Sequence, residues 1–225
     1  MKMINVTKWA VVIACIGFMA FTVQPAKADT ITFNLTNGNS AISGYPGPYA
    51  SVLVNRTDST HATITFTSLT NSGNIYLLGD GSTVGVNVNA TAFTLGGISG
   101  SNAGTGFTPG PYSQAAAGNV SEFGTFNGIV DSFDGFTHSS DLVSFTLTDI
   151  SGSWANAAAV LAANNQGFLA EAHIFVTSSP ANASNGALCT GFAGNGTGTV
   201  PDGGSTALLL GAALSVIGLV RRKLS

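Results

Sequence analysis

The sequence is poor in cysteine, with two among its 225 residues. Cys15 lies in an N-terminal segment that we expect to be removed, so Cys189 would be the single cysteine of the mature chain. One cysteine forms no internal disulfide, and stability must therefore come from a hydrophobic core. We interpret Cys189 as a small buried residue or the remnant of a pair rather than as a nucleophile, because no histidine or other base is near it in the sequence.

Charge is scarce as well, and basic residues are almost missing from the middle of the chain. Between Asp29 and Thr199, Arg56 is the single base against nine acidic residues, which gives a formal charge of −8. A domain with this charge repels phosphate backbones, so we predict that nucleic acid is not a partner. Its length suffices for one domain with a sizeable core.

Familiar catalytic and cofactor-binding patterns are also missing. The sequence has no G-x-S-x-G, P-loop or dinucleotide fingerprint. The histidines His61, His138 and His173 have no metal-ligand spacing, and His173 falls in an apolar strand, where we expect it to be a hydrogen-bonded sheet residue. We therefore predict a protein that is not an enzyme and that holds no cofactor or metal.

Two groups of acidic residues offer alternatives to that prediction. Asp131 and Asp134, with Asp141 further on, could place oxygen ligands around calcium, but the full ligand series is missing and an Asx turn is favoured. Glu122 with Asp131 or Asp134 could form a glycosidase pair, although nothing in the sequence sets their separation.

Two Pro/Gly loops carry tyrosines, at residues 45–49 and 109–112. Their rings could stack on sugars from an exposed loop, or could fold back over the edge of the core. The sequence leaves both interpretations open.

Alternation of apolar and small polar residues predicts a mainly β, antiparallel, jelly-roll-like sandwich. About nine strands are expected from this pattern and from the turns between them, among which is Asn71-Ser72-Gly73. They are predicted at residues 31–36, 51–54, 62–67, 74–78, 84–89, 91–95, 123–127, 143–148 and 172–177.

Three segments depart from the alternation. Residues 96–118, rich in Gly, Ser and Ala, are predicted to be a long loop. Residues 153–165 are predicted to be one short helix, with Ser153 as its cap and Trp154, Ala157 and Leu161 at helical spacing. The exported domain is expected to span residues 29–181, and residues 182–199 are expected to be a Gly/Asn/Thr-rich linker.

The first 28 residues are typical of a secretory signal peptide. Two lysines precede an apolar run from Trp9 to Val23, and Ala26 and Ala28 supply the small residues that signal peptidase reads, so we expect cleavage after Ala28. The alternative is a lipoprotein signal with Cys15 as the lipidated residue, but the apolar run before it is shorter than such signals require.

The C-terminal 26 residues have three parts. Val200-Pro201-Asp202-Gly203-Gly204 forms a short motif, Ser205–Val220 is an uncharged apolar run, and Arg221-Arg222-Lys223 is a basic cluster. From Gly203 to Val220 the uncharged stretch has 18 residues, about enough for a transmembrane helix. The basic cluster places the end of the chain in the cytoplasm and the domain outside.

This order of parts resembles the PEP-CTERM sorting signals, in the variant that reads Val-Pro-Asp-Ser-Gly, with Gly203 in the place of Ser. The resemblance implies processing by an exosortase-type transpeptidase and a membrane anchor that is transient. Residues 122–194 also resemble an exported domain found in other PEP-CTERM proteins, chiefly at 123–127 and 172–176. That likeness implies a surface role and no particular activity.

We therefore expect a non-catalytic cell-surface or extracellular-matrix protein, exported, sorted by an exosortase and associated with exopolysaccharide. A carbohydrate-binding or adhesive module is the alternative, and a glycan hydrolase is a weaker one.

Overall fold

The computed structural model describes residues 29–79, 81–132, 138–179, 181 and 186–195. The predicted signal peptide, sorting motif, transmembrane run and basic cluster all lie outside these residues. Within the described ranges no helix is long and apolar enough to cross a membrane.

Strands dominate the described residues, as predicted, and the remaining regular elements are two 3-10 turns. The elements are β1 (Asp29–Gly38), η1 (Ser40–Ile42), β2 (Ala50–Arg56), β3 (His61–Asn71), β4 (Asn74–Gly79), β5 (Val84–Val86), β6 (Phe93–Ser101), β7 (Tyr112–Ala115), β8 (Gly118–Val120), β9 (Gly124–Phe126), β10 (Gly128–Ser132), β11 (Ser139–Ser140), β12 (Leu142–Asp149), η2 (Ala157–Ala159), β13 (Ala170–Ser178) and β14 (Cys189–Asn195).

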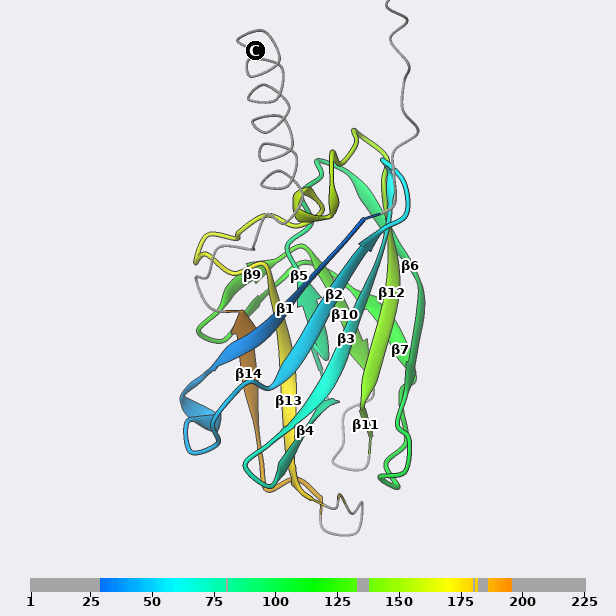
Figure 1. Cartoon of the computed structure of the whole chain (residues 1–225). Helices are drawn as coiled ribbons and strands as arrows, with labels where there is room; N and C mark the ends of the chain where they lie inside the picture. Colours follow the sequence, from blue (N-terminus) through cyan, green and yellow to red (C-terminus); the bar gives the residue numbers. More distant parts are fainter. Residues whose placement is uncertain (1–28, 80, 133–137, 180, 182–185, 196–225) are drawn as a thin grey trace, which may run out of the picture.

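Six strands close into an antiparallel barrel in the order β4-β3-β2-β1-β14-β13, and β13 pairs with β4 to complete the ring (Figure 1). The prediction of a sandwich was therefore wrong in its arrangement, although the antiparallel pairing is confirmed. Two strands are long enough to take two partners along one side. β3 pairs with β12 and then β4, and β13 pairs with β5 and then β4, so the sheet branches instead of splitting into two layers.

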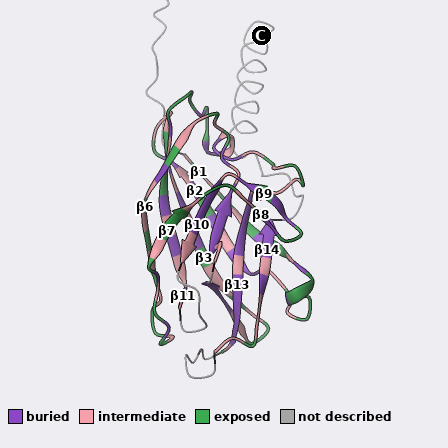
Figure 2. Ribbon diagram, turned by 180° about the vertical axis from the view of Figure 1, so that it is seen from behind, coloured by how far each residue is buried: buried purple, intermediate pink, exposed green. Residues whose placement is uncertain are grey.

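The core fills the interior of this barrel. Val54 lies opposite Ile64 and Val52 opposite Phe66 across β2 and β3, and all four side chains are fully buried. Phe66 stacks on Phe145 of β12 with ring centroids 6.3 Å apart. Such cross-strand apolar pairs are the main stabilising contacts of a sheet, and Figure 2 shows buried residues along the strands.

The hairpin between β3 and β4 confirms a turn predicted from Asn71-Ser72-Gly73. Ser72 and Gly73 both have positive φ, 51° and 80°. Two successive residues in this region form the tight turn that matches the twist of paired strands, and glycine adopts it without strain.

The predicted helix at 153–165 was wrong. Only the 3-10 turn η2 forms there, capped by the side chain of Asn156, which accepts from the Ala159 N–H. Leu161 forms a β-bridge with Val88, and the indole N–H of Trp154 donates to the Asn89 carbonyl at 2.9 Å. These tertiary contacts bury the apolar residues in an irregular path, and they outweigh a weak local helix preference.

The predicted loop at 96–118 was wrong in part. β6 continues to Ser101 and pairs with β12, and β7 begins at Tyr112. The glycines of β6 favoured a loop in the prediction, but glycine also occurs in strands at positions where a side chain of another segment packs closely against the backbone. At Gly100 that side chain is Tyr112, whose phenol occupies the space that a Cβ would take.

The predicted linker at 182–199 was wrong over most of its described part. β14 lies between β1 and β13 in the barrel wall, so the folded domain continues to Asn195, beyond the predicted boundary at 181. Its small residues serve packing. A Cβ on Gly191 would lie 2.6 Å from Asn39 Oδ1, and one on Gly194 would lie 2.5 Å from Phe123 Cδ1.

Candidate functional site

The sorting and cleavage residues predicted from the sequence lie outside the described residues. They are Ala26, Ala28, Val200, Pro201, Asp202, Gly203, Gly204, Arg221, Arg222 and Lys223. The last described residue before this C-terminal segment is Asn195, at the end of β14.

Asn195 fastens the end of β14 to the beginning of β13. Its side-chain Oδ1 accepts hydrogen bonds from Leu169 N at 2.8 Å and Ala170 N at 3.0 Å, and the residue is 5% exposed. Four residues, 196–199, separate this latched position from Val200. An extended chain of that length places the motif at most roughly 17 Å from Asn195.

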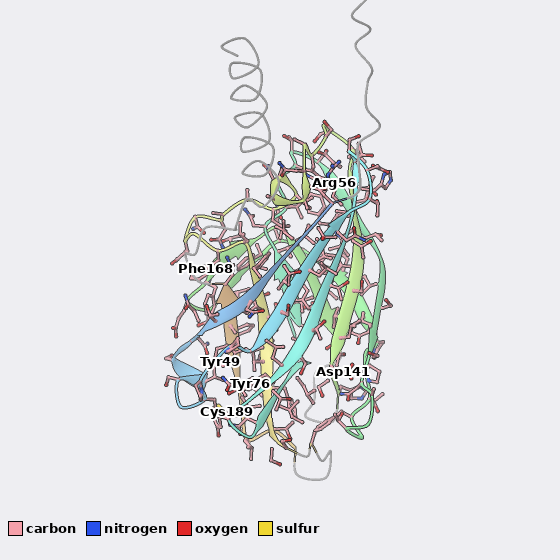
Figure 3. All side chains as sticks on the ribbon, viewed as in Figure 1. Tyr49, Arg56, Tyr76, Asp141, Phe168 and Cys189 are labelled. Atoms are coloured by element: carbon pink, nitrogen blue, oxygen red, sulfur yellow. The ribbon has the colours of Figure 1, made fainter. Side chains whose placement is uncertain are left out.

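The single base of the domain has a structural partner. Arg56 Nε donates to Asp29 Oδ1 at 2.8 Å, and Asp29 Oδ2 accepts from Ala157 N at 2.8 Å. Arg56 is 4% exposed and lies at one end of the barrel (Figure 3). It therefore ties β1, β2 and η2 together and is not an exposed anion-binding group.

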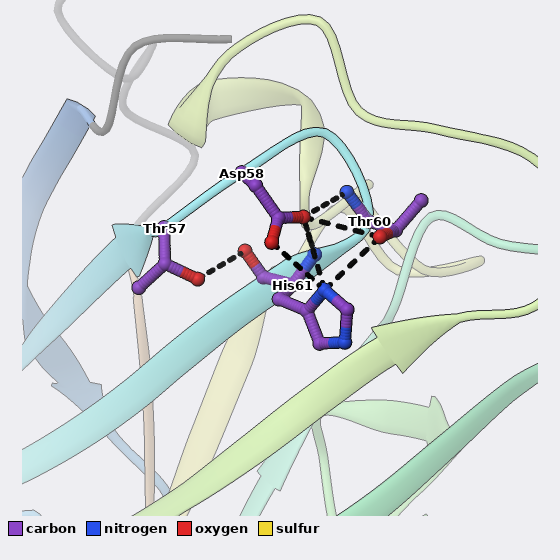
Figure 4. Close-up of polar contacts among 4 residues, drawn as sticks. All are labelled: Thr57, Asp58, Thr60 and His61. Atoms are coloured by element: carbon purple, nitrogen blue, oxygen red, sulfur yellow. Dashed lines mark hydrogen bonds and ion pairs between the residues drawn. The ribbon is translucent and has the colours of Figure 1, made fainter. Parts of the chain in front are cut away.

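Asp58 organises the β2–β3 turn, which the sequence analysis did not single out (Figure 4). Its Oδ1 accepts from Thr60 N at 2.8 Å and His61 N at 2.9 Å, and the carboxylate pairs with the His61 ring at 3.0 Å. The Thr60 N–H and then the His61 ring lower the pKa of Asp58 to about 2. This pattern is an exposed Asx turn, and the Asp-x-Thr spacing is the signal that could have revealed it.

The predicted acidic groups are engaged at separate places. Asp131 on β10 accepts from Ser82 N at 2.5 Å, and Asp141 accepts from Ser101 Oγ at 2.8 Å. Glu122 accepts from Ser40 Oγ at 2.6 Å and also from Ser40 N, and these two bonds lower its pKa. Asp134 lies outside the described residues. Among the residues described, no group of three or more His, Cys, Asp or Glu side chains could hold a metal ion.

The prediction for His173 is confirmed, whereas Cys189 is less buried than predicted. The His173 ring stacks on Phe192 with centroids 4.3 Å apart, and its Nδ1 lies 2.9 Å from the Gly81 carbonyl, which confirms a hydrogen-bonded sheet residue. Cys189 is a free, partly buried thiol whose Sγ donates to the Ala41 carbonyl at 2.9 Å. His138 Nδ1 lies 2.7 Å from the Gly110 carbonyl.

The tyrosines of the Pro/Gly loops fold back on the barrel. Tyr49 is 4% exposed, donates to the Tyr45 carbonyl at 2.6 Å and meets the Tyr76 ring edge-on at 4.9 Å (Figure 3). Tyr112 is half-buried against Ser140, and burial raises the pKa of both Tyr49 and Tyr112. Of the two interpretations left open by the sequence, the structure shows the one in which the rings cover the edge of the core.

Glu171 is the most unusual titratable group of the described chain, and the sequence analysis did not single it out. It lies on β13 between Gly194 of β14 and Gly85 of β5, and its carboxylate occupies the space over Gly85. The residue is 0% exposed, and neither Oε atom has a hydrogen-bond partner among the described residues. Burial, and then the charge of Asp131, raise its pKa well above the ordinary value.

A polar groove lies near η2. Its described lining includes Asn87, Asn89, Thr91, Asp149 and Ser151, and its volume is about 530 Å³. Asp149 is the one carboxylate among these lining residues, and it accepts from Ser151 N at 2.9 Å and Gly152 N at 2.8 Å. The described lining of the groove thus offers amide and hydroxyl groups but no pair of carboxylates.

Comparison with known proteins identifies the C-terminal segment. The sequence model of the VPDSG-CTERM motif matches residues 199–224. No curated protein and no solved structure matches the chain. The chain therefore carries a VPDSG-CTERM motif, a variant of the PEP-CTERM sorting signals, which implies export, C-terminal anchoring and processing by an exosortase-type system.

Proposed function

We propose that this is a non-catalytic protein of the cell surface or extracellular matrix, delivered by an exosortase-type transpeptidase and associated with exopolysaccharide. The observation that carries the proposal is the VPDSG-CTERM motif, which follows the last barrel strand after four residues. In this scheme signal peptidase removes residues 1–28, the apolar run 205–220 holds the barrel at the outer face of the membrane, and the transpeptidase then acts at the motif.

The short connection adds a geometric requirement. Since Val200 lies at most roughly 17 Å from the latched Asn195, the transpeptidase works close to the barrel wall. The closed barrel also includes β14, so it is completed only after the chain has crossed the membrane through Asn195. Processing in this scheme acts on a domain that is already folded.

The arrangement of polar groups supports a role without catalysis. The carboxylates of Asp29, Asp58 and Asp149 are used to hold turns and strand ends together. A glycan hydrolase needs two carboxylates facing each other across a cleft, about 5–10 Å apart. The polar groove has Asp149 alone among its described lining residues.

The experiment is intact-mass analysis of the mature protein in its native host, combined with cell fractionation. We expect the wild-type protein to lack residues 1–28 and the tail after the motif, and to leave the membrane fraction. Replacement of Val200, Pro201 and Asp202 by alanine should retain the tail and hold the protein in the membrane. Thr197→Ala, just before the motif, is the matched control and should be processed normally.

The proposal fails if the wild-type protein and the motif variant both keep Arg221-Arg222-Lys223 in the membrane fraction. The tail is then an ordinary anchor, and the protein is a membrane-tethered β-barrel domain.

Carbohydrate binding is the second candidate function. The polar groove is a better candidate site for it than the tyrosine loops, whose rings fold back on the barrel. Asn87 and Asn89 line the groove with amide groups, and Thr91 and Ser151 add hydroxyls. Neutral sugars are recognised by such groups. Titration with oligosaccharides from the host's own exopolysaccharide, followed by NMR, should shift the resonances of these residues, and an absence of shifts would remove this candidate.

A further inference from the structure

The hairpin formed by β8 and β9 lies next to the strand pair that carries the buried Glu171. These strands make a two-stranded sheet separate from the barrel sheet. Val120, Phe123 and Phe126 of the hairpin pack with Ile129 of β10 in one apolar cluster, which also takes in Phe168 and Phe192. Phe123 lies over Gly194, the residue paired with Glu171, and Figure 2 shows β8 and β9 beside β14.

Side-chain hydrogen bonds hold the rim of this hairpin. Asn164 Nδ2 donates to the Phe123 carbonyl at 2.7 Å, and Glu122 accepts from Ser40 at the other side. Because the hairpin belongs to no barrel sheet, its attachment depends on these bonds and on the apolar cluster. It is therefore the element most easily separated from the barrel without breaking the barrel's own strand pairing.

Among the described residues, no group near Glu171 supplies a permanent opposite charge to an ionised carboxylate. Asp131 of β10 has the same sign, and Glu122 of the hairpin is bonded to Ser40. His173, two residues along β13 on the same face, stacks on Phe192 and contacts Gly81. The neighbouring strand β5 consists of Val84, Gly85 and Val86 and carries no titratable group. The one basic residue of the domain, Arg56, is paired with Asp29.

Burial of an ionised carboxylate without a partner is strongly unfavourable, so a closed hairpin favours the neutral acid. An open hairpin lets water reach the carboxylate and removes this penalty. We propose that Glu171 is a pH-responsive latch: the protonated side chain keeps the β8–β9 hairpin closed on the barrel, and its ionisation opens the hairpin. Opening exposes Phe123, Phe126 and the barrel face beneath them.

The sign and slope of the effect follow from linkage. The raised pKa of Glu171 in the closed state means that closure is fully favoured below the ordinary glutamate pKa of about 4.3 and weakens as pH rises toward the raised value. One proton is released on opening in this window. The ratio of closed to open hairpin should therefore fall about tenfold for each pH unit.

The experiment is hydrogen–deuterium exchange with mass spectrometry on the full chain in detergent micelles, from about pH 5 to about pH 10. Rates are divided by the intrinsic chemical exchange rate at each pH. Peptides covering residues 118–126 should lose protection with that tenfold slope, while peptides from β2 and β3 keep theirs. In Glu171→Gln the slope should vanish. Asp131→Asn removes the like charge and so lowers the closed-state pKa of Glu171, and the loss of protection should therefore stop at a lower pH and be smaller in total.

Asp141→Asn is the matched control, because Asp141 lies in a different part of the barrel and its change should leave the wild-type slope intact. The carboxyl ¹³C resonance of Glu171 in the wild-type chain gives a second readout that needs no variant. Three results would overturn the proposal: a flat wild-type profile, an unchanged slope in Glu171→Gln, or a resonance that shows an ionised carboxylate while residues 118–126 remain protected.

Discussion

Removal of β14 should prevent the domain from folding, although the amino-acid composition of this segment is typical of a linker. We expect a chain of residues 29–195 to fold and a chain of residues 29–181 to be unfolded or aggregated. Without β14 the barrel has no strand between β1 and β13, and both become open edges, which are prone to aggregation.

The magnitude follows from the pairing. β14 pairs at three positions with β1 and at six with β13, and antiparallel strands form on average about one backbone hydrogen bond per paired position. At about 1 kcal/mol net for each bond, the loss is about 9 kcal/mol, comparable with the entire stability of a small domain, about 5–15 kcal/mol. The core contact of the fully buried Ala193 is lost in addition.

The assay is urea denaturation followed by circular dichroism, applied to residues 29–181, 29–195 and 29–199. The last two should have the same midpoint, because residues 196–199 follow the final strand, and 29–181 should show no cooperative transition. If 29–181 unfolds cooperatively with the midpoint of 29–195, β14 contributes nothing to the barrel and the assignment of the domain end to Asn195 is refuted.

Three further predictions concern single residues. Gly194→Ala should lower the free energy of unfolding by about 1–3 kcal/mol because the new Cβ would collide with the Phe123 ring. Gly44→Ala is the control and should change it little, because nothing lies within 4 Å of a Cβ at that position. Denaturant midpoints of both variants check this prediction, and equal midpoints would contradict it. Trp154→Ala should cost about 3–5 kcal/mol, since the side chain is 2% exposed and its indole N–H holds the Asn89 carbonyl, and a loss below about 1 kcal/mol would show that the irregular segment is not needed for the core. The pKa of Asp58 is lowered to about 2, so its stabilising contribution is present above the ordinary pKa of about 3.9 and is lost as pH falls toward 2. Over this acid range the Tm of Asp58→Asn should therefore fall less than the Tm of the wild type. Parallel curves of Tm against pH for the two proteins would refute the role of the turn.

Much of the fold could be predicted from local patterns. The alternation in residues 62–67 and 143–148 gave β3 and β12, because a strand with one buried face repeats every two residues and carries that signal in its own sequence. The turn at Ser72 and Gly73 was equally local. The sorting motif could also be predicted, because a short segment that an enzyme and a membrane recognise is defined by the order of its residues.

The candidate sites on the barrel could not be predicted in this way. Glu171 is one of nine acids between residues 29 and 199, and it is distinguished only by burial between Gly194 and Gly85, which lie on two other strands. The tyrosines of the Pro/Gly loops had two possible orientations. The contact of Tyr49 with Tyr76 of β4 determined which one occurs.

By itself the sequence determined that the described chain is a β domain and that the tail is a sorting signal, because both depend on the order of neighbouring residues. Only the tertiary structure decided that the sheet closes into a barrel, that residues 189–195 form a wall strand and that residues 153–165 form no helix. The physical reason is the same in each case. The role of a glycine, an alanine or a buried acid depends on the side chains that pack around it. These side chains come from segments distant in the sequence, so the neighbouring residues do not predict that role.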